Sequence, residues 1–351
     1  IYYITAVFAT LFLVGCGDGI DLPGVNVETD LNKIPLPDNN VNLEQVELKP
    51  STEPMLHEGL HTEEDFQRIR DKKAAGEEPW VSAYQLLVES QFSQKTADTY
   101  PTEWIKRGIS GDENYMNAAR GATIVYQQAL RWKIEQDDEY AAKAVENLNK
   151  WVQTCVGVTG NTNLSLAAGL YGYEFAIAGE LLRDYGGWDR ADFAAFQNWL
   201  LKVFYPANDD FLKRHHDTNA LHYWANWCLC NIAAKMAIGI VTDRRDIYNE
   251  GIDHLQTGDT NGRLRRAIYH DYAPDYNFAQ WQESGRDQGH TLMCVGLMGI
   301  ICQLAWSQGD DFFAYDDNLF MRACEYAACC NYTNETVPYT TYIWQKQSQW
   351  G

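Results

Sequence analysis

The sequence has little that would build a β-sheet, a metal centre or a cofactor site. Segments with strand-like alternation are scarce. It has no glycine-rich nucleotide loop and no serine-nucleophile elbow, which argues against the common nucleotide-binding and serine-hydrolase classes. Cysteines never recur with Cys-x-x-Cys spacing, and Cys329 and Cys330 are adjacent, so no zinc site is expected. We therefore expect a protein that works without a metal or another cofactor.

Positive charge is also in short supply. The formal net charge is -20 at pH 7, which argues against a nucleic-acid partner. Between residues 213 and 287, however, 9 Lys and Arg stand against 10 Asp and Glu, and this segment holds five of the eight His. A nearly neutral, His-rich segment within an acidic chain is compatible with binding an anionic polymer.

The N-terminal apolar run is too short to span a membrane. It covers residues 1–14, about 14 residues against the ~20 that a membrane helix needs. Because it ends in the lipobox sequence LVGC, residues 1–16 are predicted to be a signal peptide with Cys16 as the lipidated residue. A lipid on Cys16 would hold the protein at the bacterial cell envelope, in the periplasm or on the outer-membrane surface. The remaining cysteines mostly lie in apolar helical text and are expected to be buried thiols.

Residues 17–55 combine Gly, Pro, Asn and acidic residues without periodicity, which predicts a flexible linker. Helical periodicity then fills residues 56–351, beginning at a capping-box-like sequence, Thr62 to Asp65. Helices are expected at about residues 114–135, 139–155, 165–184, 191–203, 223–240, 247–256, 291–307 and 319–330. The run at 292–306 is apolar on all sides, which predicts a buried inner helix. This pattern predicts an all-α array of helix pairs, either a closed toroid or an open solenoid.

Two polar clusters stand immediately before apolar helical runs, and we interpret them as a binding or catalytic site. Residues 281–291 (WQESGRDQGHT) hold four ionisable side chains and two glycines. Upstream, residues 213–217 (KRHHD) lead into residues 222–227 (HYWANW). Such concentrations of His, Asn, Arg and aromatic side chains are typical of sites that bind an acidic sugar.

Together with Gly262 and residues 305–311 (AWSQGDD), these clusters resemble the alginate-lyase-like polysaccharide lyases with helical toroid folds, in particular polysaccharide lyase family thirty-eight. The resemblance extends from about His61 to Tyr342 and is densest between His222 and Asp316. It implies an (α/α) toroid that cleaves an anionic polysaccharide by β-elimination. Relatives of this kind continue beyond the position of Gly351, so we expect an incomplete toroid that lacks its C-terminal part.

Beta-elimination from a 4-linked uronic acid removes the proton at C5, needs the C6 carboxylate neutralised, and protonates the leaving O4. A tyrosine can serve as base and acid, although its ordinary pKa of about 10 requires a nearby cation. The resemblance and the loop sequence around Ala273-Pro274 favour Tyr272 for this role. Tyr269 and Tyr276 remain alternatives.

For the carboxylate neutraliser, the candidates are His216, its neighbours His215 and His222, and the amides of Asn161 and Asn163. Three histidines within eight residues favour a functional role over a structural one. The resemblance places an asparagine and a histidine in these two regions, and the choice among the three histidines stays open.

Arg286 and His290 are four residues apart, so on a helix they would share one face and point at the sugar acid. Glu283 or Asp287 would orient them, or would instead satisfy Arg286 within a helix-start network. Trp224 and Trp281 are candidates for stacking on sugar rings. Trp227, on the apolar side of its helix, is expected to lie in the core.

Two other functions fit parts of this pattern. A glycoside hydrolase would need two carboxylates across the scissile bond, for which Asp217 with Glu283 or Asp287 would serve. A non-catalytic glycan-binding lipoprotein would share the anchor, the helices and the aromatic side chains. The Arg and His around those acids would hold them ionised, which disfavours proton donation by a hydrolase. The binding protein has no need of a tyrosine beside concentrated Arg and His, so the residues favour a lyase acting on a uronate polymer of the alginate or glucuronan type.

Overall fold

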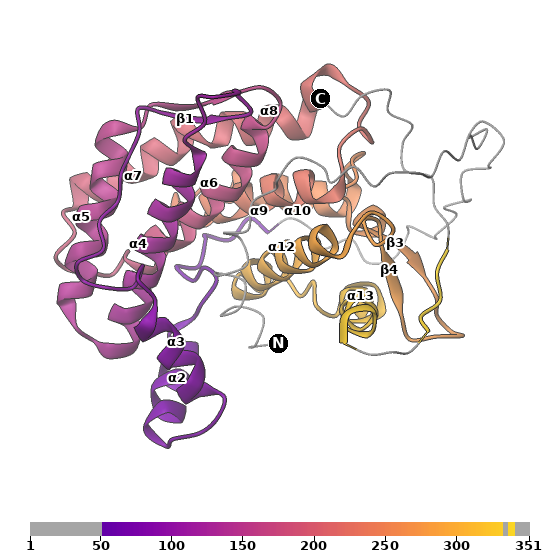
Figure 1. Ribbon diagram of the computed structural model, residues 1–351, viewed down its shortest axis with the longest axis horizontal. Coiled ribbons are helices and arrows are strands. Elements are labelled where there is room, and N and C mark those ends of the chain that lie inside the picture. Colours follow the sequence, from indigo (N-terminus) through magenta and orange to yellow (C-terminus); the bar gives the residue numbers. More distant parts are fainter. Residues whose placement is uncertain (1–50, 333–335, 341–351) are drawn as a thin grey trace.

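The structure, a computed structural model, describes residues 51–332 and 336–340 (Figure 1). Cys16, the predicted signal peptide and most of the predicted linker lie outside these residues. The helices are α2 (Glu63–Ala74), α3 (Trp80–Glu89), α4 (Tyr115–Glu135), α5 (Asp138–Thr154), α6 (Leu164–Leu181), α7 (Arg190–Val203), α8 (Tyr205–Arg214), α9 (Ala225–Val241), α10 (Arg245–Thr257), α11 (Leu264–Ala267), α12 (Gln288–Ser307) and α13 (Tyr315–Tyr332), with the 3-10 turn η2 (His215–Asp217). The strands are β1 (Trp104–Arg107), β2 (Gly157–Gly160), β3 (Ile268–Asp271) and β4 (Ala279–Trp281).

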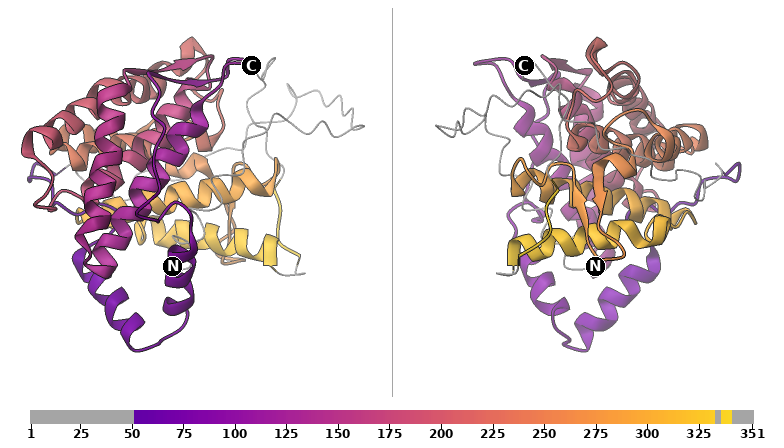
Figure 2. Two further views of the ribbon diagram at one scale, coloured as in Figure 1. Left: turned by 60° about the vertical axis from the view of Figure 1, so that its left-hand side comes forward. Right: turned by 90° about the vertical axis from the view of Figure 1, so that its right-hand side faces the viewer.

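Helices α4, α6, α9 and α12 follow one another as neighbours and form the inner layer of a curved array. Helices α5, α7, α10 and α13 pack against them from outside (Figures 1 and 2). The α2–α3 hairpin projects from this body in both figures. The fold is therefore the toroid-like, all-α arrangement of paired helices that the sequence predicts.

The division into layers follows from the helix surfaces. Every residue of α9 except Trp227 is buried, and α6 is buried apart from Leu164 and Glu174, so neither helix has a polar face to turn toward solvent. Helix α10, in contrast, buries one stripe, which includes Ile247, Gly251 and Leu255. An apolar helix surface must be covered, so α6 and α9 are placed inside and α10 outside.

Helix α12 confirms in part the prediction of a buried inner helix. Within residues 51–332 and 336–340 it is the only helix that is both long and apolar enough to cross a membrane. Its most apolar window is 56% buried against the rest of the protein, and Trp306 at its end is exposed, so the helix is covered along one side rather than all round.

The predicted helices agree with the structure to within a few residues, and the capping box at Thr62 is present. Helix α8 was not predicted, although a proline in its first turn is a common helix start. Two short strand pairs were also missed. Strands β1 and β2 are parallel, and β3 and β4 form an antiparallel hairpin with an irregular register between Ile268 and His270.

Residues 51–55, predicted as the end of the linker, pack on the domain. Asn249 donates its side-chain amide to the carbonyl of Ser51 at 2.9 Å. Arg245 donates to the carbonyls of Glu53 and Pro54, and Met55 is buried. These contacts hold residues 51–55 against α10.

Candidate active site

The turn η2 fixes His216 at the end of α8. Residues His215, His216 and Asp217 all have positive φ, 48°, 52° and 59°. For residues with a Cβ this left-handed conformation costs about 1–2 kcal/mol each. The turn directs the His216 ring toward the start of α6, where its Nε2 lies 2.9 Å from the hydroxyl of Ser165.

The loop between β2 and α6 carries Asn161 and Asn163, and the structure brings it to His216. The Thr162 carbonyl hydrogen-bonds the His216 ring. Asn161 Oδ1 accepts the backbone N–H of Asn163 at 2.9 Å and its side-chain amide at 3.0 Å, an Asx-type turn that orders the loop. Two of the regions predicted to neutralise a carboxylate therefore lie together.

Burial lowers the pKa of His216, although the Asp210 charge and the Thr162 carbonyl oppose that shift. His216 is accordingly neutral at pH 7. A neutral imidazole has one donor and one acceptor nitrogen, so it can hydrogen-bond a substrate carboxylate without being charged.

Tyr223 belongs to this group, and the sequence argument gave it no role. Its ring centroid is 5.8 Å from that of His216 and 4.7 Å from that of His222, and its hydroxyl hydrogen-bonds Thr162. Its position directly after His222 in the HYWANW segment was the available signal.

His215 was a candidate for substrate binding, and the structure contradicts this. Its ring is buried, lies 4.7 Å from the Phe211 ring, and places Nε2 3.6 Å from the Cys228 sulfur. Burial lowers its pKa to about 4. His215 is a core residue. Trp227, expected in the core, is only partly buried and packs against the core, with its ring 4.6 Å from that of Tyr223.

The turn between β4 and α12 caps the start of α9. Trp224, the N-cap residue of α9, provides no side-chain cap of its own. Gln282 Oε1 instead accepts the backbone N–H of Ala225, and Glu283 Oε1 accepts that of Asn226, both at 3.0 Å. A carboxylate at this position also interacts favourably with the positive end of the helix.

Glu283 cannot bind substrate, because its side chain is fully buried. It also accepts the Asn226 side-chain amide at 2.9 and 3.0 Å, Arg286 at 2.9 Å and the Cys294 thiol at 3.2 Å. Burial raises its pKa, while Arg286 and the Asn226 backbone oppose the rise. Glu283 is a positioning residue for α9 and Arg286.

Trp281 cannot stack on a sugar. It is fully buried, donates its indole N–H to the Ala323 carbonyl at 2.9 Å, and packs against Phe320. The prediction that it faces substrate is wrong because all three residues of β4 are buried.

Arg286 and His290 do not share a helix face, because α12 begins only after Asp287. Asp287 joins them: it accepts from His290 Nδ1 at 2.6 Å and lies 3.7 Å from Arg286 Nε. With the Glu283 contact, this is the helix-start network that the sequence left open. The Arg286 guanidinium also lies over the ring of Trp224, 5.2 Å from its centroid, and covers a tryptophan that is 7% exposed.

The β3–β4 hairpin carries the tyrosines. Tyr272 donates its hydroxyl to Gln280 Oε1 at 2.6 Å and lies 3.0 Å from the Thr340 hydroxyl. Its ring stacks on Tyr326, and the exposed Tyr276 meets it edge-on at 6.5 Å. Tyr269 lies on β3 and is partly buried. Among the described residues, no hydrogen bond or ring contact joins Tyr272 to His216.

The sequence argument expected a cation to lower the pKa of Tyr272, and the structure differs. Burial raises this pKa, with Thr340 opposing the rise. Arg265 forms ion pairs with Asp271 and Asp316, so its charge is balanced by carboxylates.

Comparison with known proteins identifies the family. The family model described as Alginate lyase matches residues 70–335. The chain belongs to the alginate lyase family. This assignment supports polysaccharide lyase activity. A search of curated proteins finds no match.

Solved structures of alginate lyases have the same fold at low sequence identity. Alginate lyase A1-III from Sphingomonas species A1 is 14% identical, with a TM-score of 0.55 over 79% of this chain and 80% of that one. A His-to-Ala variant of A1-III complexed with tetrasaccharide gives a TM-score of 0.60 at 14% identity, over 80% and 82% of the two chains. An alginate lyase from Bacteroides ovatus gives 0.53 at 14%, over 77% and 82%. At this identity the likeness establishes the fold alone.

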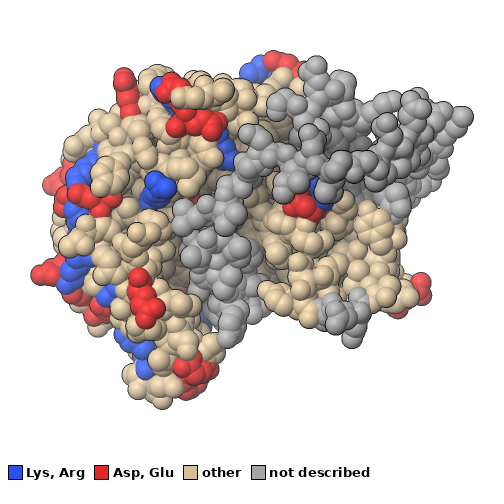
Figure 3. Space-filling model, viewed as in Figure 1, with Lys and Arg blue, Asp and Glu red and all other residues tan. Residues whose placement is uncertain are grey.

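The charge pattern of this alginate lyase family member is mixed. Over the described part of the face in Figure 3, Lys and Arg are scattered among Asp and Glu, without one continuous basic area. Lys213 pairs with Asp209 at 2.8 Å, and Arg214 with Asp210 at 2.6 Å. The basic residues of the KRHHD segment are thus neutralised locally.

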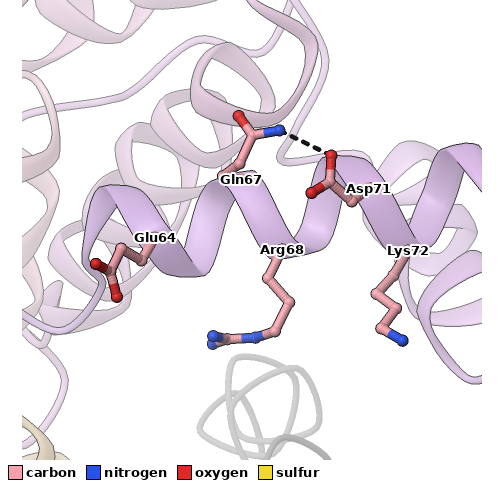
Figure 4. Close-up of a pocket in the computed structure, with 5 residues that line it drawn as sticks. All are labelled: Glu64, Gln67, Arg68, Asp71 and Lys72. Carbon is pink, nitrogen blue, oxygen red and sulfur yellow. Dashed lines mark hydrogen bonds between the residues drawn. The ribbon is translucent and has the colours of Figure 1, made fainter.

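A shallow hollow on α2 is unrelated to the chemistry. It is lined by Glu64, Gln67, Arg68, Asp71 and Lys72, all from one helix, and Gln67 donates to Asp71 at 2.8 Å (Figure 4). Side chains of both charges on a single exposed helix provide no enclosed surface for a sugar chain. The residues described also contain no cluster of three or more His, Cys, Asp or Glu arranged to hold a metal ion.

Proposed function

We propose that the protein cleaves a 4-linked uronic-acid polymer, of the alginate or glucuronan type, by β-elimination, and that within its family it is most like polysaccharide lyase family thirty-eight. The family assignment supports the reaction class. The observation that carries the site is the contact between the Asn161–Asn163 loop and His216, which gathers neutral hydrogen-bonding groups suited to a C6 carboxylate.

In the proposed reaction, Asn161, Asn163 and His216 bind the carboxylate and so make the C5 proton more acidic. Tyr272 reacts in the fraction of molecules that hold it as the tyrosinate: the phenolate oxygen takes the C5 proton, the C4–O4 bond breaks as the C4–C5 double bond forms, and the resulting hydroxyl gives that proton to O4. His222, Tyr269 and Tyr276 border these groups and are proposed to contact neighbouring sugars. Arg286 contributes positive charge just before α12, and His290 is held beside it through Asp287.

The hydrolase alternative is disfavoured by the state of its carboxylates. Glu283 is fully buried, and Asp217 is ion-paired with Arg214 at 2.9 Å. Burial alone would raise the pKa of Asp287, but hydrogen bonds and charge from His290, with Arg286, lower it below its ordinary value. An acid held ionised in this way is a poor proton donor for a glycosidic oxygen.

The test is ultraviolet absorbance of the unsaturated uronate product during separate incubation with alginate, polyglucuronate and a neutral glucan. A rise with one uronate polymer and none with the glucan is expected. Tyr272→Phe should abolish the rise, whereas Tyr100→Phe, at an exposed tyrosine outside the proposed site, should retain it. New reducing ends without absorbance would instead establish a hydrolase, and oligosaccharide binding without either signal would establish a binding protein.

We also propose that a lipid on Cys16 holds the enzyme at the bacterial envelope; the support is the lipobox sequence. Detergent partition of the expressed full-length protein tests this. The protein should enter the detergent phase, and a Cys16→Ser variant should remain in the aqueous phase.

A further inference from the structure

Arg107 is a buried cation that has no acidic partner. It is 6% exposed, and its Nη1 atom has no hydrogen-bond acceptor. Its guanidinium lies over the ring of Tyr115, 4.7 Å from the centroid, and Tyr115 in turn stacks on Tyr171. A cation–π contact offsets only part of the cost of removing a guanidinium from water.

The other buried Lys and Arg side chains each have the acidic partner that Arg107 lacks. Arg131 pairs with Glu135, Lys235 with Asp209 and Glu250, and Arg322 with Asp271. Within the described part of the chain, Arg107 is the one buried Lys or Arg without an ion pair. Since an unpaired buried charge destabilises a fold, an anion from outside the chain is the natural partner.

Arg107 also lies beside the loop that carries Asn161 and Asn163. It is the last residue of β1, and its register partner on β2 is Gly160, which directly precedes Asn161. The side chain of Asn161 lies against Gly108, so close that a Cβ there would be 1.9 Å from its Oδ1. Along β1 the buried Ile105 and Arg107 alternate with the more exposed Trp104 and Lys106, so the Arg107 side chain faces inward. Strand β1 lies beside α6 (Figure 1).

We propose that Arg107 is a substrate-binding residue that recognises a uronate carboxylate on the sugar chain held at the Asn161–Asn163 loop. This inference rests on the proposed function and extends it with a specificity determinant. A guanidinium presents two parallel N–H donors that match a carboxylate, whereas neutral sugars offer no such partner. Arg107 therefore selects acidic over neutral polymers.

The experiment compares Arg107→Gln and Arg107→Lys with Arg120→Gln, a matched control at an exposed arginine of α4. Cleavage kinetics give KM and kcat, and calorimetry measures binding of a uronate oligosaccharide, a sulfated oligosaccharide and a neutral one. Arg107→Gln should raise KM and the uronate Kd about 10- to 100-fold, with a smaller change in kcat. Arg107→Lys should recover part of that loss because charge is kept while the paired donors are lost.

Thermal unfolding separates binding from structure. Because Arg107 carries an unpaired buried charge, Arg107→Gln should unfold at or near the wild-type Tm, and saturating uronate oligosaccharide should raise the Tm of wild type more than that of the variant. Wild-type KM in a folded Arg107→Gln protein would overturn this inference and leave the proposed function intact. The inference would also be overturned if Arg107→Gln and Arg107→Lys both unfold at a lower temperature and the unfolded fraction accounts for their lost activity. A wild-type protein that neither binds nor cleaves uronates would overturn both. Tighter binding of the sulfated sugar would overturn the assignment to a carboxylate.

Discussion

Replacing Glu283 by glutamine should loosen the start of α9 and with it the candidate site. The carboxylate is surrounded only by donors: the backbone and side-chain N–H groups of Asn226, the Arg286 guanidinium and the Cys294 thiol. Glutamine keeps the shape but turns an amide N–H₂ group toward these donors. At least one of them loses its acceptor, and Arg286 loses its buried counter-charge.

The magnitude follows from opposing contributions. A hydrogen bond to a charged group contributes about 1.5–3 kcal/mol, and breaking a buried ion pair costs about 3–5 kcal/mol. The Arg286 side chain is 27% exposed, so water replaces part of what it loses. Glutamine also carries no charge, so the variant avoids the free-energy cost of burying a carboxylate, the same cost that raises the pKa of Glu283. We expect a net loss of about 1–3 kcal/mol, or roughly 2–6 °C in Tm for a domain of this size.

Differential scanning calorimetry at pH 7 measures this loss, with Glu325→Gln on α13 as the control because Glu325 is exposed. The control should unfold within about 1 °C of wild type, as most surface substitutions do. The kcat of Glu283→Gln should also fall, since α9 carries Tyr223 and Trp224 at its start. An unfolding temperature equal to that of Glu325→Gln would refute the capping role of Glu283.

Three further predictions follow from the site. Burial raises the pKa of Tyr272 and lowers that of His216. From pH 7 to 9 the histidine therefore stays neutral, while the fraction of tyrosinate grows about tenfold per pH unit. The value of kcat/KM should rise over this range, and a flat profile would exclude Tyr272 as the base. Ser165→Ala removes the His216 hydrogen bond and should lower kcat about 5- to 10-fold with little change in Tm; unchanged kinetics would argue against His216. Gly160→Ala places a Cβ 1.7 Å from the Arg107 carbonyl oxygen and should prevent stable folding. In the control Gly111→Ala the new Cβ meets nothing within 4 Å, and the change should cost about 1 kcal/mol of stability. Equal unfolding temperatures of the two variants would contradict the close approach of the strands.

The fold could be predicted because its helices are periodic and its inner helices are apolar all round. Helix α12 could be placed inside from its sequence alone, since no face of it is polar. Helix α8 carries four charged residues in ten, Asp209, Asp210, Lys213 and Arg214. Two of its stabilising ion pairs, Lys213 with Asp209 and Arg214 with Asp210, lie within the helix and are not visible as a hydrophobic pattern. The short strand pairs were missed because each pair depends on a partner segment rather than on its own alternation.

The site was predicted as a region, and its individual roles were not. Residues 281–291 were recognised as important, yet Trp281 packs in the core and Glu283 caps α9, so neither faces a ligand. A cap supplied from a different segment has no local sequence signature, unlike the capping box at Thr62. The His215–Asp217 turn likewise could not be foreseen, because three successive left-handed residues run against local preference.

Three departures from local rules lie beside the Asn161–Asn163 loop. His216 adopts a left-handed conformation, Gly160 has a φ of 150°, and Arg107 is buried without a counter-charge. Gly160 precedes Asn161 directly, Arg107 pairs with it across the strands, and His216 bonds Thr162 between the two asparagines. Left-handed residues also occur elsewhere in the described chain, at Asp316, Asp317 and Asn318 for example, so strain alone does not mark a site. What distinguishes the Asn161–Asn163 loop is that a buried arginine and a neutral histidine lie beside it together.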